Sequence, residues 1–168
     1  ASSHRCGVPA NLQGIWNEQL RPPWDCDLHN DINIQMNYWP AETTNLAETH
    51  RPLFDLIRYY QPGGREMARR LGMKGWCMGH STDIWGHAQI MSRTAFWGGS
   101  FFGGQWMTFH ILEHYRFNRD KEFLKRAYPI MKGSAEFFLD MLITDPKTGW
   151  LVTAPSNSPE NTFIMPGG

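Results

Sequence analysis

The segment from Leu28 to Pro40 carries an unusual density of hydrogen-bonding side chains. Its sequence, LHNDINIQMNYWP, places one imidazole, one carboxylate, four amides, one phenol and one indole within thirteen residues. A core segment does not need so many polar groups of different kinds, because each must find a partner once it is buried. A sugar does need them, because its hydroxyl groups donate and accept hydrogen bonds and its C–H faces stack on aromatic rings. The segment therefore predicts a carbohydrate-binding site.

Two histidines extend this prediction. His29 lies in the first polar segment, and His80 lies in a second one, GHSTDIWG, at residues 79–86. Both could bond sugar hydroxyl groups, although a histidine satisfied by backbone atoms is the ordinary alternative for either one. Asp83 indicates a turn that holds its loop, or else a contact to substrate. Trp85 and Trp39 could each offer an apolar plate to a sugar ring, since the eight tryptophans are many for a chain of this length; a Trp-rich core is the alternative.

Hydrolysis of a glycosidic bond requires a protonated carboxylic acid at the leaving oxygen and a base that activates water. Glu160 is the best candidate for the acid, because it follows a proline in a loop of small and polar residues, where positioned catalytic groups are common. The same pattern also fits an ordinary surface turn. Asp31 lies beside Asn30 and Asn33, and it could cap a helix and still take part in the site.

A zinc site is the rival interpretation. His110, Glu113 and His114 form the pattern H-x-x-E-H, with both histidines on one face of a predicted helix. A zinc peptidase also needs a third ligand, for which no motif is evident, and such a short match arises easily by chance. The three cysteines, Cys6, Cys26 and Cys77, are too widely spaced for a metal-type pair and do not indicate a compartment. We expect no metal and no cofactor.

Composition limits the partners. The 168 residues suffice for one domain with a core, and 16 basic residues balance 16 acidic ones, so no nucleic acid is expected to bind. No apolar run is long enough to insert into a membrane. The chain opens without methionine and closes on a loop-like Pro-Gly-Gly sequence, which predicts a piece of a longer protein.

Hydrophobic periodicity and the positions of glycine and proline predict helical hairpins joined by polar, aromatic loops that gather at one end of the array. Helices are predicted over residues 31–39, 49–60, 62–71, 104–117 and 120–142, a long connection over 73–100, a strand over 150–152 and a loop over 155–161. Asp31 suits the start of the first helix, and Pro40 marks its end. Pro129 predicts an interruption of the last helix.

Five segments, taken in order, resemble glycoside hydrolase family 95. They are PANLQGIWN at 9–17, NIQMNYWPAE at 33–42, TDIWG at 82–86, YPIMKG at 128–133 and PSNSPEN at 155–161. The resemblance covers nearly the whole chain. It implies a mainly α fold, the first part of an (α/α)6 barrel, with residues 1–168 as a single partial domain from the N-terminal portion of the catalytic domain.

The resemblance also implies an activity: an α-L-fucosidase that releases terminal, typically α-1,2-linked, L-fucose with inversion and without metal. Glu160 matches the general acid, and Asn33 matches the second of two asparagines that orient and activate water with help from a downstream Asp. Asp31 stands where the first asparagine is usual. Either Asp31 contributes base character, or the water is activated in a modified way.

The implied substrate is a fucosylated oligosaccharide or glycan, because His29 matches a histidine beside the methyl group of fucose. An α-L-galactosidase of the same family and a sugar-binding fragment that lacks the downstream base remain alternatives. The rest of the parent polypeptide would complete the barrel. The resemblance alone suggests secretion or a periplasmic location.

Overall fold

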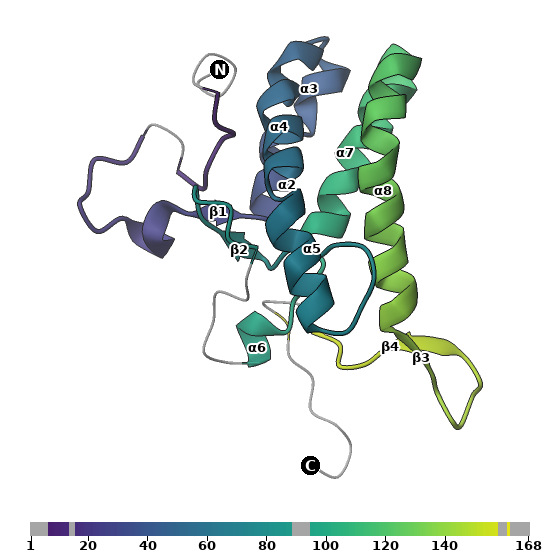
Figure 1. Cartoon of the computed structure of the whole chain (residues 1–168). Coiled ribbons are helices and arrows are strands. Elements are labelled where there is room, and N and C mark those ends of the chain that lie inside the picture. The colour runs from purple at the N-terminus through teal and green to yellow at the C-terminus, as the bar shows by residue number, and fades with distance from the viewer. Residues whose placement is uncertain (1–6, 14–15, 89–94, 158–160, 162–168) are drawn as a thin grey trace.

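Helices dominate the computed structural model, which describes residues 7–13, 16–88, 95–157 and 161 (Figure 1). The α-helices are α2 (Ile32–Tyr38), α3 (Pro40–Thr43), α4 (Arg51–Tyr59), α5 (Gln61–Arg70), α6 (Ala95–Gly98), α7 (Gly103–Asn118) and α8 (Lys121–Met141), and the short 3-10 helices are η1 (Pro23–Cys26) and η2 (Ala47–His50). The strands form two antiparallel pairs, β1 (Leu28–His29) with β2 (Ser81–Thr82) and β3 (Leu142–Thr144) with β4 (Leu151–Thr153). The predicted mainly α fold is confirmed.

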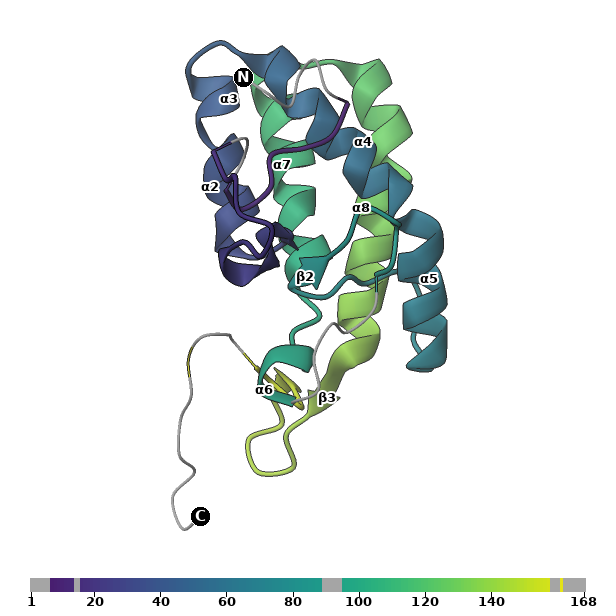
Figure 2. The same cartoon turned by 90° about the vertical axis from the view of Figure 1, so that its left-hand side faces the viewer.

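Helix α7 is central, because it contacts α2, α3, α4 and α8. It forms an antiparallel hairpin with α8, and Figure 2 shows α2 on the opposite side of α7 from α8. Strand β2, helix α6 and the β3–β4 hairpin lie toward the end where α7 begins and α8 ends (Figures 1 and 2). The polar, aromatic connections thus gather toward one end of the helices, as the sequence predicts.

Local signals set the ends of α2. The carboxylate of Asp31 accepts a hydrogen bond from the backbone N–H of Asn33 at 3.4 Å, which makes Asp31 the N-cap. The helix ends at Tyr38, and Pro40 begins α3, where a proline costs no intrahelical hydrogen bond. Both features match the prediction.

The predicted interruption of α8 at Pro129 is wrong, because the helix continues from Lys121 to Met141. Pro129 and Lys125 are both exposed, so the carbonyl group that loses its helical partner can bond water instead. Trp76 stabilises the following turn, because its Nε1–H donates a hydrogen bond to the carbonyl of Ile130 at 2.8 Å. Packing therefore overrides the local effect of the proline.

The predicted connection over residues 73–100 contributes to the core. Every residue from Trp76 to Thr82 is buried. Gly75 permits this course: its φ is +69°, and a Cβ atom there would overlap the carbonyl group of Gly133 on α8. No helix among the described residues is long and apolar enough to cross a membrane.

Candidate active site

Strands β1 and β2 bring two of the polar segments together. Leu28 pairs with Thr82, and His29 pairs with Ser81. The sequence predicted a sugar-contacting role for each segment separately. The pairing places them side by side at the start of α2.

Asn30 fixes the junction where β1 and β2 pair at the start of α2, called here the β1–β2 junction, and it is completely buried. Its backbone N–H donates to the carbonyl of His80 at 2.5 Å, and its Nδ2 donates to the carbonyl of Gly79 at 3.1 Å and to Oγ1 of Thr82 at 2.9 Å. A Cβ atom at Gly103 would lie 2.7 Å from the Gly79 oxygen and 2.9 Å from the Cβ of Asn30. The first residue of α7 must therefore be small for the helix to approach so closely.

Asp27 orients His29. Its carboxylate lies against Nδ1 of His29 and also accepts a hydrogen bond from the hydroxyl group of Ser81. The ring of His29 meets the ring of His80 edge to face, with centroids 6.3 Å apart. The structure thus brings together the two histidines that were predicted to contact sugar.

His80 is buried, and its ring lies 5.5 Å from the ring of Trp97. Burial lowers the pKa of His80 below its usual value, and the positive charge that His29 can carry lowers it further, although the negative charges of Asp31 and Asp27 oppose the shift. A neutral imidazole has one donor and one acceptor nitrogen, which suits a sugar hydroxyl group.

Asp31 and Asn33 lie in the first turn of α2, directly after this junction, and both side chains are half-buried. Ile34 and Gln35, the next two residues, are buried against the helices behind them. The buried side chains of Ile34 and Gln35 therefore set the rotation of α2 about its own axis. Asp31 and Asn33 lie at the end of α2 where the two polar segments meet.

Asp83 holds the loop that follows β2. Its carboxylate accepts hydrogen bonds from the backbone N–H groups of Trp85 at 2.8 Å and His87 at 3.3 Å, and lies 2.7 Å from Nδ1 of His87. Partial burial raises the pKa of Asp83, but these hydrogen bonds outweigh it and leave the pKa lowered. The turn-forming interpretation therefore fits the contacts of Asp83. Trp85 is 72% exposed in this loop.

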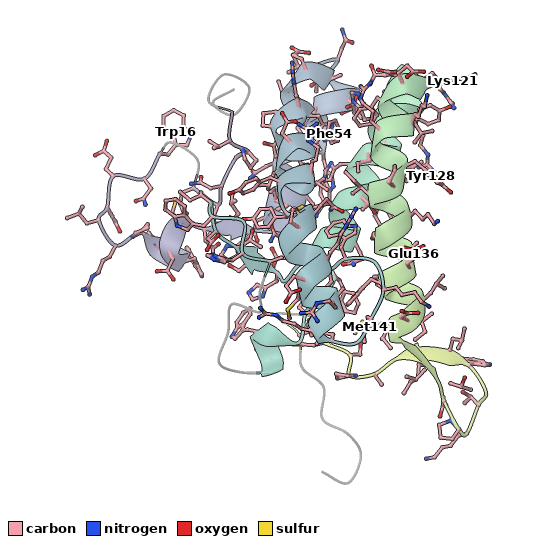
Figure 3. All side chains as sticks on the ribbon, viewed as in Figure 1. Trp16, Phe54, Lys121, Tyr128, Glu136 and Met141 are labelled. Carbon is pink, nitrogen blue, oxygen red and sulfur yellow. The ribbon has the colours of Figure 1, made fainter. Side chains whose placement is uncertain are left out.

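Trp39 lies at the opposite end of α2 from Asp31 and is 53% exposed. Seven helical residues span about 10 Å, so the structure does not bring Trp39 to the His29–His80 pair. Trp16, on the N-terminal segment, also points away from the helices (Figure 3).

Glu160 lies outside the described residues. The segment that leads to it is described as far as Asn157, whose side-chain amide donates a hydrogen bond to the carbonyl of Phe96 in α6. Phe96 precedes Trp97, the residue whose ring packs against His80. Asn157 thus lies beside α6, the helix whose Trp97 packs on His80.

The zinc pattern separates in three dimensions. Nε2 of His110 lies 2.7 Å from Oε1 of Gln35, whereas Nδ1 of His114 lies 2.6 Å from Oε1 of Glu42. Glu113 is partly exposed and pairs with Arg116 on the same helix at 3.8 Å. The H-x-x-E-H residues therefore do not converge on one point.

Glu42, His50 and His114 could offer one ligand atom each to a metal ion, since these atoms lie within 4.8 Å of one another. However, Nδ1 of His50 and Nδ1 of His114 lie only 2.7 and 2.6 Å from the same oxygen of Glu42. Two ligands of a tetrahedral zinc ion are about 3.3 Å apart, given metal–ligand bonds of about 2.0 Å. The separations fit hydrogen bonds better than shared coordination.

The whole chain, residues 1–168, matches the model of the glycosyl hydrolase family 95 catalytic domain. The chain belongs to glycosyl hydrolase family 95. It is 44% identical over 99% of its length to "Alpha-L-fucosidase 2" of Arabidopsis thaliana. It is 36% identical over 96% of its length to "Probable alpha-fucosidase A" of Aspergillus niger.

This family 95 chain spans about a fifth of the length of these relatives, 20% of the first and 21% of the second. The family resemblance that the five sequence segments carried is confirmed. The described helices are consistent with part of a helical barrel of this family.

Sequence reasoning missed the residues that support the site from behind. Asp27 precedes His29 by two residues, and that spacing places side chains on one face of an extended segment, which was a usable signal. The buried groups Gln35, Glu42 and His50 gave no local signal, because their partners on α7 are 60 to 76 residues away in the sequence.

Proposed function

We propose that the parent protein is an inverting glycoside hydrolase that releases terminal α-L-fucose, α-1,2-linked, from oligosaccharides or glycans. In this proposal residues 1–168 form the N-terminal portion of its (α/α)6 catalytic domain. The family membership and the printed names of the two relatives support the substrate class.

One observation carries the assignment of the site. His29, His80 and the first turn of α2 meet at the β1–β2 junction, and α6 packs on His80 while also binding the chain at Asn157. Glu160 follows Asn157 by three residues, and in this proposal it lies on the side of the sugar opposite to the water-binding groups. Proton donor and water-binding groups would then flank one sugar.

In the proposed reaction Glu160, protonated at the start, donates its proton to the glycosidic oxygen as the bond to the sugar breaks. Asn33 and Asp31 hold a water molecule on the opposite face of the ring, and this water attacks the anomeric carbon. Its proton passes to Asp31 or to a base supplied by the rest of the protein. In inverting enzymes the acid and base are roughly 6.5–9.5 Å apart, which leaves room for the water.

The remaining residues bind the sugar. His29, oriented by Asp27, and the neutral His80 exchange hydrogen bonds with its hydroxyl groups. Asp83 holds its loop against the site, and the exposed ring of Trp85 offers an apolar plate. Trp39 serves as a second plate only if the substrate extends along α2.

The test uses the full-length protein and an oligosaccharide with a terminal α-1,2-linked fucose, followed by proton NMR. We expect free fucose to appear first as the β-anomer, because inversion of an α-linkage gives the β-product. Initial release of the α-anomer would contradict inversion. Faster cleavage of a matched α-L-galactoside would favour that substrate, and binding without any cleavage would favour a sugar-binding protein.

Glu160→Gln tests the acid. We expect activity on unactivated substrates to fall on the order of 10²–10⁴-fold, the usual contribution of a general acid. Glu136→Gln on α8, a partly exposed residue whose nearest cation is Lys132, serves as the matched control. Near-normal hydrolysis by Glu160→Gln would remove Glu160 as the proton donor.

A further inference from the structure

A line of buried polar side chains crosses the helices behind the proposed site. Oε1 of Gln35 on α2 lies 2.7 Å from Nε2 of His110 on α7. Nδ1 of His110 lies 2.9 Å from Nε2 of His50 in η2. Nδ1 of His50 lies 2.7 Å from Oε1 of Glu42 on α3. All four residues are 5% exposed or less, so each bond is shielded from water.

Glu42 is the acceptor at the end of this line. Its carboxylate also accepts hydrogen bonds from Nδ1 of His114 at 2.6 Å and from Nδ2 of Asn118 at 2.8 Å. Burial raises the pKa of Glu42, but the hydrogen bonds from His50, His114 and Asn118 outweigh it and leave the pKa lowered. The carboxylate is therefore ionised at neutral pH.

The two histidines inside the line are neutral. Burial lowers the pKa of His110 to about 4 and also lowers that of His50. With one proton each, His110 donates through Nδ1 to His50, and His50 donates through Nδ1 to Glu42. Nε2 of His110 then accepts a hydrogen bond. A 180° rotation of the Gln35 amide supplies that donor, because Nε2 of Gln35 is buried and otherwise lacks a partner.

We propose that His110 is a positioning residue for the proposed hydrolysis: through Gln35 it fixes the rotation of α2 and thereby the direction of Asp31 and Asn33. This inference rests on the proposed function. Gln35 follows Asp31 by four residues, one helical turn, so a change at Gln35 is transmitted directly to the first turn.

Helix α2 needs such support because it is short. Seven residues do not form a stable helix alone, and tertiary contacts must hold it. Tyr38 stacks on His50 with ring centroids 5.5 Å apart and meets His110 edge to face at 6.3 Å, and these ring contacts hold α2 against its neighbours. Stacked rings can slide and rotate, whereas the bond between Gln35 and His110 has a defined direction.

The test compares Gln35→Met with wild type in the full-length protein. Methionine keeps the length and helix propensity of glutamine and removes the hydrogen bond, while His110, His50 and Glu42 are untouched. We expect kcat to fall 10- to 100-fold with KM changed less than threefold, because the first turn handles water. His110→Phe should reproduce this loss, and His110→Gln, which keeps an amide in reach, should recover part of it.

A double-mutant cycle separates positioning from a general loss of folded protein. If Gln35 acts through Asn33, Gln35→Met should cost less than about threefold in an Asn33→Ala background. A loss of folded enzyme would lower activity by the same factor in both backgrounds and would overturn the proposal. Thr108→Val is the control, because Thr108 is buried on α7 and its hydroxyl group donates to the carbonyl of Gln105 within the same helix.

Hydrogen exchange keeps the two proposals distinguishable. In Gln35→Met the amides of residues 35–39 should exchange at least tenfold faster, whereas Thr108→Val should leave them unchanged. If wild-type protein releases no fucose, the proposed hydrolysis fails, and the exchange rates alone decide whether Gln35 and His110 hold α2. Unchanged exchange in Gln35→Met overturns the positioning role whether or not the protein is active.

Discussion

The side-chain amide of Asn30 donates a hydrogen bond to Oγ1 of Thr82 at 2.9 Å, across 52 residues of sequence and inside a completely buried contact. Together with the backbone bond to His80, this contact joins the segment that carries Asp31 and Asn33 to the segment that carries His80 and Asp83. The two parts of the proposed site are therefore held together from behind.

Asn30→Ala should destabilise this junction. The substitution removes the amide that bonds the carbonyl of Gly79 and the hydroxyl group of Thr82, and a buried polar group that loses its partner costs about 1–3 kcal/mol. We expect a lower midpoint of thermal unfolding and weaker substrate binding in the full-length protein. Asn37→Ala is the control, because Asn37 is exposed and makes one long bond to Asn11. Equal midpoints for the two variants would contradict the role of Asn30.

The substitution Asp31→Asn distinguishes the effect of the negative charge of Asp31 from its effect as the N-cap of α2. Asparagine caps a helix as well as aspartate does, so the free energy of unfolding should change by less than about 0.5 kcal/mol. If the charge of Asp31 assists the attacking water, kcat should still fall tenfold or more. Asp31→Ala removes both functions and should cost a further ~1 kcal/mol of stability. Undiminished activity in Asp31→Asn would show that the charge is not needed.

Acid should weaken the buried line of histidines. The pKa of His110 is lowered to about 4, below that of an unfolded histidine near 6.5. Between these values the unfolded chain binds a proton that the folded chain does not, so stability is lost as pH falls from about 6.5 to about 4. For His110 alone the loss is on the order of 3 kcal/mol.

The lowered pKa values of His50 and Glu42 act in the same direction. The side chains that bond to His110, Gln35 and the neutral His50, carry no charge at pH 7. Thermal unfolding of the full-length protein from pH 7 to pH 4.5 measures the effect. His110→Phe should show a shallower pH dependence than wild type. A slope as steep as that of wild type would assign the acid sensitivity to other groups.

Chelation should leave the protein unchanged. The contacts among Glu42, His50 and His114 have hydrogen-bond lengths, so treatment with EDTA should not alter the unfolding midpoint or the activity. Elemental analysis of the purified full-length protein gives an independent measurement. One equivalent of zinc that is lost in Glu42→Gln would contradict the hydrogen-bonded interpretation.

The sequence by itself determined the local elements and the family. Asp31 as an N-cap, Pro40 at the break after α2 and the apolar spacing of α4 depend on neighbouring residues, so they were readable before any fold was known. The five family segments needed only their order and spacing. These features predicted a mainly α chain, and the family match confirmed the resemblance.

Only the tertiary structure decided which distant residues meet. The pairing of His29 with Ser81 and the contact between Gln35 and His110, 75 residues apart, have no local signal in either segment. The continuity of α8 through Pro129 likewise depends on solvent access at Lys125 and on the bond from Trp76 to Ile130. Caps and periodicity act within one turn of the chain, whereas these contacts depend on how whole helices pack, and packing is a property of the assembled fold.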